Sequence, residues 1–193
     1  MTSHGQAHFQ RIYDASKDPW NYQSSDYEKA KRDATIAALD GRRFQSGLEV
    51  GCSIGELTHC LSACCDQLLG VDFIDDALTV ARVRCGNQPW VSFRNVRVPL
   101  EWPDGQFDLI VLSEVLYFLS PEDSLALAGR CRHCLAPEGV MLLVNWLDKS
   151  RDDPSSGDAA AARFIDSGRD WFRVGSGSRT ERYRIDRLDR NGG

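Results

Sequence analysis

The chain has 193 residues, of which 42% are hydrophobic and 26% are charged, the composition of an ordinary folded domain. Its formal net charge of −5 argues against general binding to a nucleic-acid backbone, because proteins of that kind usually carry a basic surface. No apolar run approaches the roughly 20 residues that cross a bilayer, and the polar start Met1–Gln6 lacks the apolar core of a signal peptide. We therefore expect one domain over residues 1–193, without nucleic-acid partner or membrane span, in the cytoplasm.

Seven cysteines are scattered through apolar segments of the chain. Cys60, Cys64 and Cys65 are expected to lie in one helix, where thiols pack as small hydrophobic groups. Cys131 and Cys134 form the only pair with the spacing of metal ligands, and no second pair completes a zinc site. The sequence therefore predicts free buried thiols and no structural metal.

The first 45 residues are predicted to form a helical cap on the domain. A short amphipathic helix fits His8–Tyr13, and Asp18-Pro19 would interrupt it. A longer helix is predicted from about Ser25 to Leu39, because small and aromatic residues recur there at helical spacing.

Three aromatic residues within this cap, Tyr13, Trp20 and Tyr22, fall outside any regular core pattern. One interpretation is that they form a lid over a cleft. The other is that they fix the N-terminal segment to the sheet. The two interpretations are compatible, and the sequence favours neither.

The segment Gly47–Asp72 has the pattern of a nucleoside-binding half-fold. A short apolar strand ends at Val50 and is followed by the glycine turn Gly51–Gly55 and a helix, and the second apolar strand ends on Asp72. Glycines let the backbone approach a ligand closely, and a terminal carboxylate accepts hydrogen bonds from ribose hydroxyls. Asp72 follows Gly51 at close to the usual spacing of about 20 residues.

The rest of the core, which we delimit as residues 46–147, repeats strand and helix. Strands are predicted at Val91–Val96, Phe107–Leu112 and Val140–Trp146. A helix from about Asp75 to Arg84 and another from Ser120 to about Leu135 alternate with them, the latter opening with a capping serine and a proline. Repeated strand–helix units imply an α/β fold, a Rossmann-like doubly wound and mostly parallel sheet that binds ligands beyond the carboxyl ends of its strands.

Residues 148–193 are predicted to add a helix and an edge strand to this core. Asp152–Gly157 and Val174–Ser178 have loop composition, and Pro137–Gly139 is a turn before the last core strand. Ala159–Ser167 is expected to be helical, and Thr180–Leu188 alternates enough to form a final edge strand.

The glycine turn distinguishes between nucleoside cofactors. A dinucleotide fingerprint needs three glycines at a set spacing, and Gly51-Cys52-Ser53-Ile54-Gly55 does not match it. Glu49 would repel a phosphate-rich ligand but would tolerate a cationic amino-acid nucleoside. Here the sequence resembles the class I S-adenosylmethionine-dependent methyltransferases, whose first motif Glu49, Gly51 and Gly55 fit. Ser53 replaces the middle glycine, so we expect the backbone there to avoid conformations that only glycine tolerates.

A narrower resemblance is to the NodS family of nodulation methyltransferases, and it covers roughly the first 145 residues. That family is associated with oligosaccharide biosynthesis, through N-methylation of the free amine on the non-reducing glucosamine of a lipo-chitooligosaccharide. The resemblance implies a methyltransferase that converts S-adenosyl-L-methionine to S-adenosyl-L-homocysteine while methylating an amino sugar. The segments that carry it are Asp18-Pro19-Trp20, Tyr27-Glu28-x-x-Lys31, Leu48–Cys52 and Phe107–Tyr117.

The resemblance also implies roles at the methionine end of the cofactor. The Gly51 carbonyl and, through water, Glu49 would hold the methionine ammonium. Lys31 would reach the methionine carboxylate, and Ser113 would lie beside the sulfonium. Trp20 is a further candidate for contact with the cofactor.

At the nucleoside end, Asp72 would take the ribose hydroxyls and Phe73 would lie against the adenine face. Val96 and Arg97 correspond to the loop at the adenine edge. Family members commonly have an acid at the position of Arg97, so adenine recognition here would rest on backbone groups.

On the acceptor side, Glu114 is the candidate to orient the amine and later receive a proton, with Tyr117 beside it. Asn145 and Trp146 would form an acceptor wall, and Tyr22 would stack on a sugar. Bland alternatives remain: Glu114 caps the following segment, Tyr117 belongs to the core and Trp146 closes the sheet.

Three other functions remain open at this point. The first is methylation of oxygen or of another amine by the same fold. The second is a nicotinamide oxidoreductase, which the incomplete glycine fingerprint disfavours. The third is a cofactor-binding protein without turnover, which is compatible with Ser53 and Arg97. The sequence does not determine the acceptor or the oligomeric state.

Overall fold

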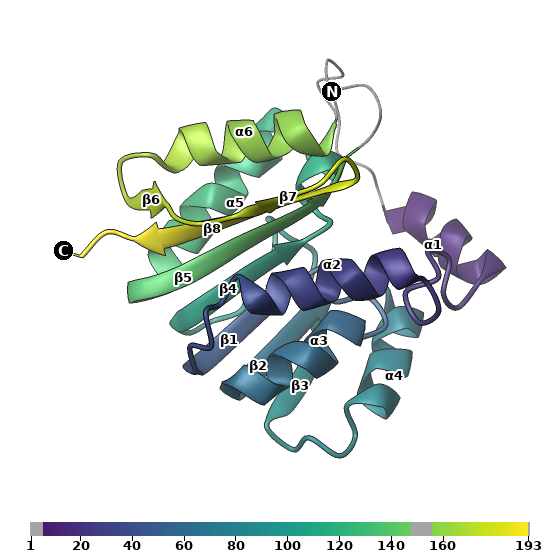
Figure 1. Cartoon of the computed structure of the whole chain (residues 1–193). Helices are drawn as coiled ribbons and strands as arrows, with labels where there is room; N and C mark the ends of the chain where they lie inside the picture. The colour runs from purple at the N-terminus through teal and green to yellow at the C-terminus, as the bar shows by residue number, and fades with distance from the viewer. Residues whose placement is uncertain (1–5, 148–155, 193) are drawn as a thin grey trace.

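Eight strands form one sheet at the centre of the computed structural model, which describes residues 6–147 and 156–192 (Figure 1). Long apolar runs in the central strands leave residues such as Ile110 and Leu142 without any exposed surface, as expected where both faces of a sheet are covered. The strands are β1 (Phe44–Val50), β2 (Cys65–Asp72), β3 (Val91–Asn95), β4 (Phe107–Ser113), β5 (Leu135–Trp146), β6 (Phe172–Val174), β7 (Ser178–Arg179) and β8 (Tyr183–Arg190).

The first five strands are parallel and lie in the order β3-β2-β1-β4-β5. Val50 at the end of β1 pairs with Val71 of β2 on one side and Leu112 of β4 on the other. The chain order therefore reverses beside β1, which is the switch point where doubly wound sheets bind ligands. This confirms the predicted fold class.

Six α-helices and two 3₁₀ segments are present among the described residues. Ser25 caps α2 by accepting a hydrogen bond from the Glu28 N–H, and Ser120 caps α5 in the same way from Asp123. The cap at Ser120 is the one that the sequence predicts, and the cap at Ser25 stands at the predicted start of its helix. The helices are α1 (Gln6–Ala15), α2 (Asp26–Ala37), α3 (Glu56–Leu61), α4 (Asp75–Arg84), α5 (Pro121–Cys134) and α6 (Gly157–Gly168), and the 3₁₀ segments are η1 (Ser62–Cys64) and η2 (Leu116–Phe118).

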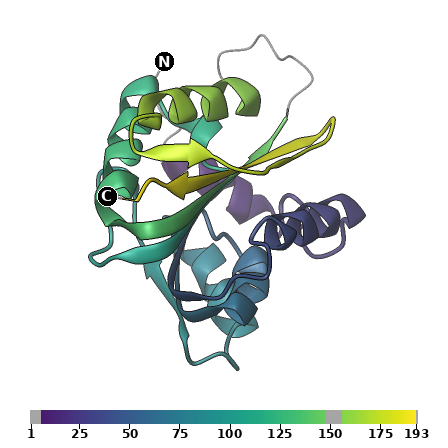
Figure 2. The ribbon, with the colours of Figure 1, turned by 60° about the vertical axis from the view of Figure 1, so that its left-hand side comes forward.

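The helices form two layers around the sheet (Figure 2). Leu127 of α5 and Phe164 of α6 pack with one face of the strands, while Leu57 and Leu61 of α3 pack with the other. Helix α1 instead lies over the carboxyl ends of the strands, where Phe9 contacts a small cluster that includes Ile74. No helix within the described ranges is long and apolar enough to span a membrane.

The tail adds more to the sheet than the sequence predicts. Strand β8 is not an edge strand, because it pairs antiparallel with β5 on one side and with β6 on the other. The short strands β6 and β7 both pair with β8 at this edge, and they are too short to be recognised from their pattern. They include Val174 and Ser178, the two ends of the segment predicted as a loop. The helix predicted at Ala159–Ser167 is confirmed as α6, whereas most of the predicted loop Asp152–Gly157 lies outside the described residues.

Two further local predictions are wrong. Cys60, Cys64 and Cys65 do not share a helix, because Cys65 already begins β2. The predicted turn Pro137–Gly139 lies inside β5, where the pairing with β4 shifts register and Glu138 has a φ of +58°. An irregularity of this kind keeps the strand continuous while it accommodates extra residues.

Candidate active site

A cavity of about 700 Å³ lies at the carboxyl ends of the parallel strands. This volume is in the range of small-molecule sites in proteins, roughly 300–1,000 Å³. Each of the five parallel strands contributes to its wall at or just after its last residue, and α1 and the 18–31 segment close it from above. The strand-end contributors are Gly51, Phe73, Val96, Glu114 and Trp146.

The glycine turn forms the floor of this cavity only in part. Gly51 has a φ of +82°, and a Cβ there would stand 2.5 Å from the carbonyl oxygen of Ser113, so β1 and β4 can meet here only at a glycine. Gly55 does not line the cavity. It has a φ of +78° and lies against Ala81, which makes it a packing contact between α3 and α4.

Ser53 corrects a sequence-based expectation. Its φ is +48°, in the left-handed region that glycine favours, and this conformation costs an L-residue roughly 1–2 kcal/mol. Two contacts hold it there: its N–H donates to Asp72 Oδ2 at 2.9 Å, and its hydroxyl lies 2.5 Å from the Tyr13 hydroxyl. The second contact ties α1 to the glycine turn.

Asp72 lines the cavity and organises the turn around it. Its Oδ2 accepts from Ser53 and its Oδ1 accepts from the Ile74 N–H at 3.1 Å. Burial raises the pKa of Asp72, although these N–H groups lower it. Each carboxylate oxygen has a second lone pair, so the same side chain can accept hydrogen bonds from a ligand.

Phe73, Val96 and Arg97, the residues predicted for contact with adenine, all line the cavity. Phe73 meets Phe9 of α1 edge to face, with ring centroids 5.4 Å apart. The Arg97 N–H donates to the Glu101 carboxylate at 2.9 Å, so an acid is near this loop even though position 97 is basic.

Glu49 is buried beneath the turn and does not line the main cavity. The Thr58 hydroxyl donates to its Oε2 at 2.5 Å, and burial raises the pKa of Glu49 to about 7. It borders a second cavity of about 30 Å³, shared with Gly51 and Lys31. That volume is enough for an ordered water.

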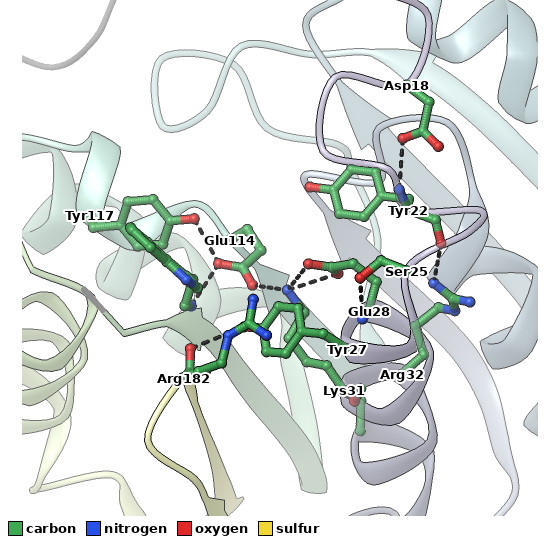
Figure 3. A network of polar contacts seen from close by, with 12 residues as sticks. Asp18, Tyr22, Ser25, Tyr27, Glu28, Lys31, Arg32, Glu114, Tyr117 and Arg182 are labelled. Carbon is green, nitrogen blue, oxygen red and sulfur yellow. Dashed lines mark hydrogen bonds and ion pairs between the residues drawn. The ribbon is translucent and has the colours of Figure 1, made fainter. Parts of the chain in front are cut away.

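The strongest polar cluster of the cavity centres on Glu114 (Figure 3). Lys31 Nζ lies 2.5 Å from Glu114 Oε1 and 2.9 Å from Glu28 Oε2. The Tyr117 hydroxyl and the Trp146 N–H both donate to Glu114 Oε2, at 2.6 and 2.7 Å. Glu114 itself has a φ of +57°, and such strain is frequent at functional sites.

These contacts set the protonation states of the cluster. Burial lowers the pKa of Lys31, but the Glu114 and Glu28 carboxylates raise it and prevail. Burial, together with the neighbouring Glu114 charge, raises the pKa of Tyr117 well above its usual value. Lys31 is therefore a cation, and Tyr117 is a neutral hydrogen-bond donor. Tyr117 is also not merely a core residue, because it lines the cavity.

The 18–22 segment supplies the aromatic wall. Asp18 accepts from the Tyr22 N–H at 2.8 Å, and Arg32 donates to the Tyr22 carbonyl at 2.7 Å, which fixes the segment to α2. Trp20 lies 5.5 Å from Tyr13 and 5.7 Å from Tyr22, by ring centroids. The aromatic residues therefore both anchor the N-terminal segment and line the cavity, so the two sequence interpretations hold together.

Trp146 and Asn145, which are neighbours at the end of β5, have different environments. Trp146 is 41% exposed and lines the cavity, whereas Asn145 has no exposed surface and does not. Successive residues of a strand point to opposite faces, so the two neighbours cannot share one wall. Asn145 is removed from the candidate acceptor wall.

Tyr27, Glu28 and Arg182 are polar lining residues that the sequence-based site leaves out. Tyr27 and Glu28 lie on α2 at helical spacing from Lys31, which is a signal the sequence does contain. Arg182 comes from the turn between β7 and β8. Its guanidinium carbon lies 3.7 Å from the Tyr27 ring centroid, although the two residues are 155 positions apart. No local pattern could have revealed that contact.

The sheet order, the glycine turn and the cavity at the strand ends define the fold of the class I S-adenosylmethionine-dependent methyltransferases. The family model of Nodulation protein S (NodS) matches residues 4–144. The chain belongs to the NodS family.

Individual relatives agree with this assignment. Nodulation protein S of Bradyrhizobium diazoefficiens is 36% identical over 140 residues, which cover 70% of this chain and 66% of that protein. A putative methyltransferase structure from Pseudomonas syringae is 32% identical, with a TM-score of 0.74, and the match covers 85% of this chain and 99% of that one. The chain spans about half to two thirds of the length of the curated relatives that it matches.

A solved NodS structure shares the fold. N-methyltransferase NodS from Bradyrhizobium japonicum, crystallised with S-adenosyl-L-homocysteine, superposes with a TM-score of 0.81 over 95% of this chain and 97% of that one. At 20% identity this comparison concerns the fold alone.

Proposed function

We propose that this protein is an S-adenosyl-L-methionine-dependent N-methyltransferase that acts on the free amine of an amino sugar. The non-reducing glucosamine of a chitooligosaccharide or lipo-chitooligosaccharide is the acceptor that its family suggests. The observation that carries the proposal is one cavity with two chemically different ends. Gly51 and Asp72 supply the part proposed for the cofactor, and the Glu28–Lys31–Glu114 cluster supplies the part proposed for the acceptor. Lys31 is thus engaged by two carboxylates of the protein, and we assign it to this cluster in place of the role at the methionine carboxylate that the resemblance implies.

The cofactor end fits a cationic amino-acid nucleoside. Asp72 offers carboxylate oxygens at the end of β2, and Phe73 and Val96 provide apolar surface for a base. Glu49 can compensate an ammonium through the small cavity that it shares with Gly51. The bound cofactor supplies a methyl group on a sulfonium, which reacts by in-line displacement. For such a reaction the protein mainly contributes alignment and a matched electrostatic environment.

The acceptor end suits a nitrogen nucleophile. The two carboxylates and the single ammonium of the cluster leave one net negative charge, which attracts a cationic amine. Glu114 accepts three hydrogen bonds from the protein and can accept another from an amine N–H. Trp146 and Tyr22 offer aromatic surfaces for a sugar ring.

The reaction balances without a strong base. The lone pair of a neutral amine attacks the methyl carbon, the carbon–sulfur bond breaks, and its electrons stay on the sulfur. The methylated nitrogen is then a cation, and it becomes the neutral product when it loses one proton. Glu114 is the proposed group that orients the amine and passes this proton toward solvent. A sugar amine is partly neutral near physiological pH, so deprotonation before attack needs little help.

The proposal is tested by methyl transfer to chitooligosaccharides followed by mass spectrometry. An oligomer with a free amine at its non-reducing end is expected to gain one methyl group, and the fully N-acetylated oligomer is expected to gain none. Methylation of both oligomers would instead indicate O-methylation. Binding of S-adenosyl-L-homocysteine, measured by calorimetry, without turnover on any amine would favour a binding protein, and no binding to folded protein would contradict the cofactor assignment.

A further inference from the structure

Arg182 lines the acceptor end of the cavity and has no carboxylate partner among the described residues. Of the two other cations that line the cavity, Lys31 is engaged by Glu28 and Glu114, while Arg97 follows β3 at the adenine end. Arg182 is therefore the one cation near the amine site, within the described ranges, that remains available to a ligand.

The position of Arg182 is fixed before any ligand arrives. Its guanidinium lies over the Tyr27 ring, and its carbonyl accepts from the Tyr27 hydroxyl at 3.0 Å and from the Leu147 N–H at 2.8 Å (Figure 3). Thr180 Oγ1 accepts from the Arg182 N–H at 3.2 Å and from that of Tyr183 at 3.1 Å, which holds the turn. A guanidinium that is already stacked and oriented loses less entropy when it binds an anion.

The distance between the amine site and Arg182 suits one small acceptor. Arg182 Cζ lies 3.7 Å and Lys31 Nζ 5.1 Å from the same Tyr27 ring centroid. The two cations are thus separated by no more than the sum of these distances, and Lys31 contacts Glu114 directly. A single acceptor can place its amine at Glu114 and another group at Arg182.

We infer that the acceptor is an amino sugar that carries an oxyanion, a phosphate or a carboxylate, which Arg182 binds. This inference rests on the proposed N-methylation of an amino sugar. It narrows the acceptor to one that carries an oxyanion besides its amine, which an unsubstituted chitooligosaccharide lacks. A planar guanidinium matches both oxyanions through paired hydrogen bonds, and it has no comparable match in a neutral sugar hydroxyl. Within the acceptor part of the cavity, the negative Glu28–Lys31–Glu114 cluster complements the amine of such an acceptor, and Arg182 complements its oxyanion.

Binding to protein saturated with S-adenosyl-L-homocysteine tests the inference without any turnover. The ligands are glucosamine, glucosamine 6-phosphate and 2-amino-2-deoxygluconate, measured by calorimetry with the wild type, Arg182→Ala and Arg182→Lys. Arg173→Ala is the matched control, because it removes one exposed cation of the same sheet that does not line the cavity.

The wild type is expected to bind an anionic amino sugar more tightly than glucosamine. Arg182→Ala should weaken that binding by about tenfold or more, the effect of one charged hydrogen bond, and should leave glucosamine binding unchanged. Arg182→Lys should retain part of the preference, and Arg173→Ala all of it. The better of the two anionic ligands identifies the oxyanion.

Two outcomes separate this inference from the proposed function. Equal binding of glucosamine and both anionic sugars by the wild type, or an unchanged preference in Arg182→Ala, overturns the role of Arg182 even if amines are methylated. Arg182-dependent binding of an anionic sugar together with no methylation of any amine overturns the proposed function and leaves the Arg182 site standing.

Discussion

Lys31 Nζ and Glu114 Oε1 lie 2.5 Å apart and join α2 to the end of β4 across 83 positions of sequence. Both side chains are almost completely buried, and Glu28 contacts the same ammonium. One ion pair thus connects the N-terminal cap to the strand end that carries the proposed amine site. Its removal affects stability and activity differently, depending on which partner is changed.

Lys31→Met is expected to lower the free energy of unfolding by about 3 kcal/mol, because it leaves two buried carboxylates without their shared cation. Urea denaturation followed by circular dichroism measures this change. Lys29→Met, an exposed change on the same helix, is the control and should be nearly neutral. Equal stability of the two variants would mean that the ion cluster contributes nothing to the fold.

Glu114→Gln is expected to reduce kcat by about a hundredfold, within the range for loss of a proton-transfer group, because the amide keeps the shape but not the charge. Tyr117→Phe removes one donor to the same carboxylate and should cost less, about tenfold. Single-turnover kinetics with a free-amine chitooligosaccharide measures both. The exposed Glu122→Gln is the control. A Glu114→Gln enzyme as fast as the wild type would remove Glu114 from the proton path.

Asp72→Asn is expected to weaken binding of S-adenosyl-L-homocysteine by about 1.5–3 kcal/mol, because the charged acceptor at the end of β2 is lost. Calorimetry measures the affinity, and urea denaturation checks that the Ser53 turn has survived the change. Asp75→Asn, an exposed acid in the first turn of α4, should leave the affinity unchanged. If folded Asp72→Asn binds as well as the wild type, Asp72 serves the turn alone.

Glu49 predicts a pH dependence of stability. Its pKa is about 7 in the folded protein, against the ordinary value of 4.5 expected in the unfolded chain. The folded state therefore holds the proton more tightly, and the free energy of unfolding should fall as pH rises from about 4.5 through 7, by roughly 3 kcal/mol in total. Urea denaturation at a series of pH values should show this fall in the wild type and a flatter profile in Glu49→Gln.

The Glu49 carboxyl also predicts that cofactor affinity rises with pH, whereas the free energy of unfolding falls. A protonated Glu49 has no charge to offer the methionine ammonium, so the affinity for S-adenosyl-L-homocysteine should decrease as pH drops below about 7. Calorimetry at a series of pH values measures this trend, with Glu49→Gln as the variant that lacks it. An identical pH profile in wild type and variant would place the ammonium elsewhere.

Much of the core follows from local sequence. Apolar runs such as Phe107–Leu112 predict buried parallel strands, and Ser120 predicts a helix start, because capping and burial depend on residues close in the chain. The strand-end positions of Asp72 and Glu114 follow in turn, because parallel strands end at the same edge of the sheet.

The failures have a common physical origin in pairing between distant segments. Strand β8 is internal because β5 and β6 both pair with it, which its own alternation does not encode. Ser53 reaches a left-handed conformation because Asp72 and Tyr13 hold it. Arg182 meets Tyr27 only because the tail folds back beside α2.

The contact between Tyr27 and Arg182 joins a residue inside the segment that the NodS family model matches to a residue outside it. The residues proposed for the cofactor lie inside the segment 4–144 that the NodS family model matches, while Trp146 and Arg182 lie beyond it. On these proposed roles, substitutions in the tail are expected to change the acceptor and to leave cofactor binding unchanged. A relative that shares the first 144 residues but has no arginine in its β7–β8 turn is expected to lack the proposed preference for an anionic acceptor.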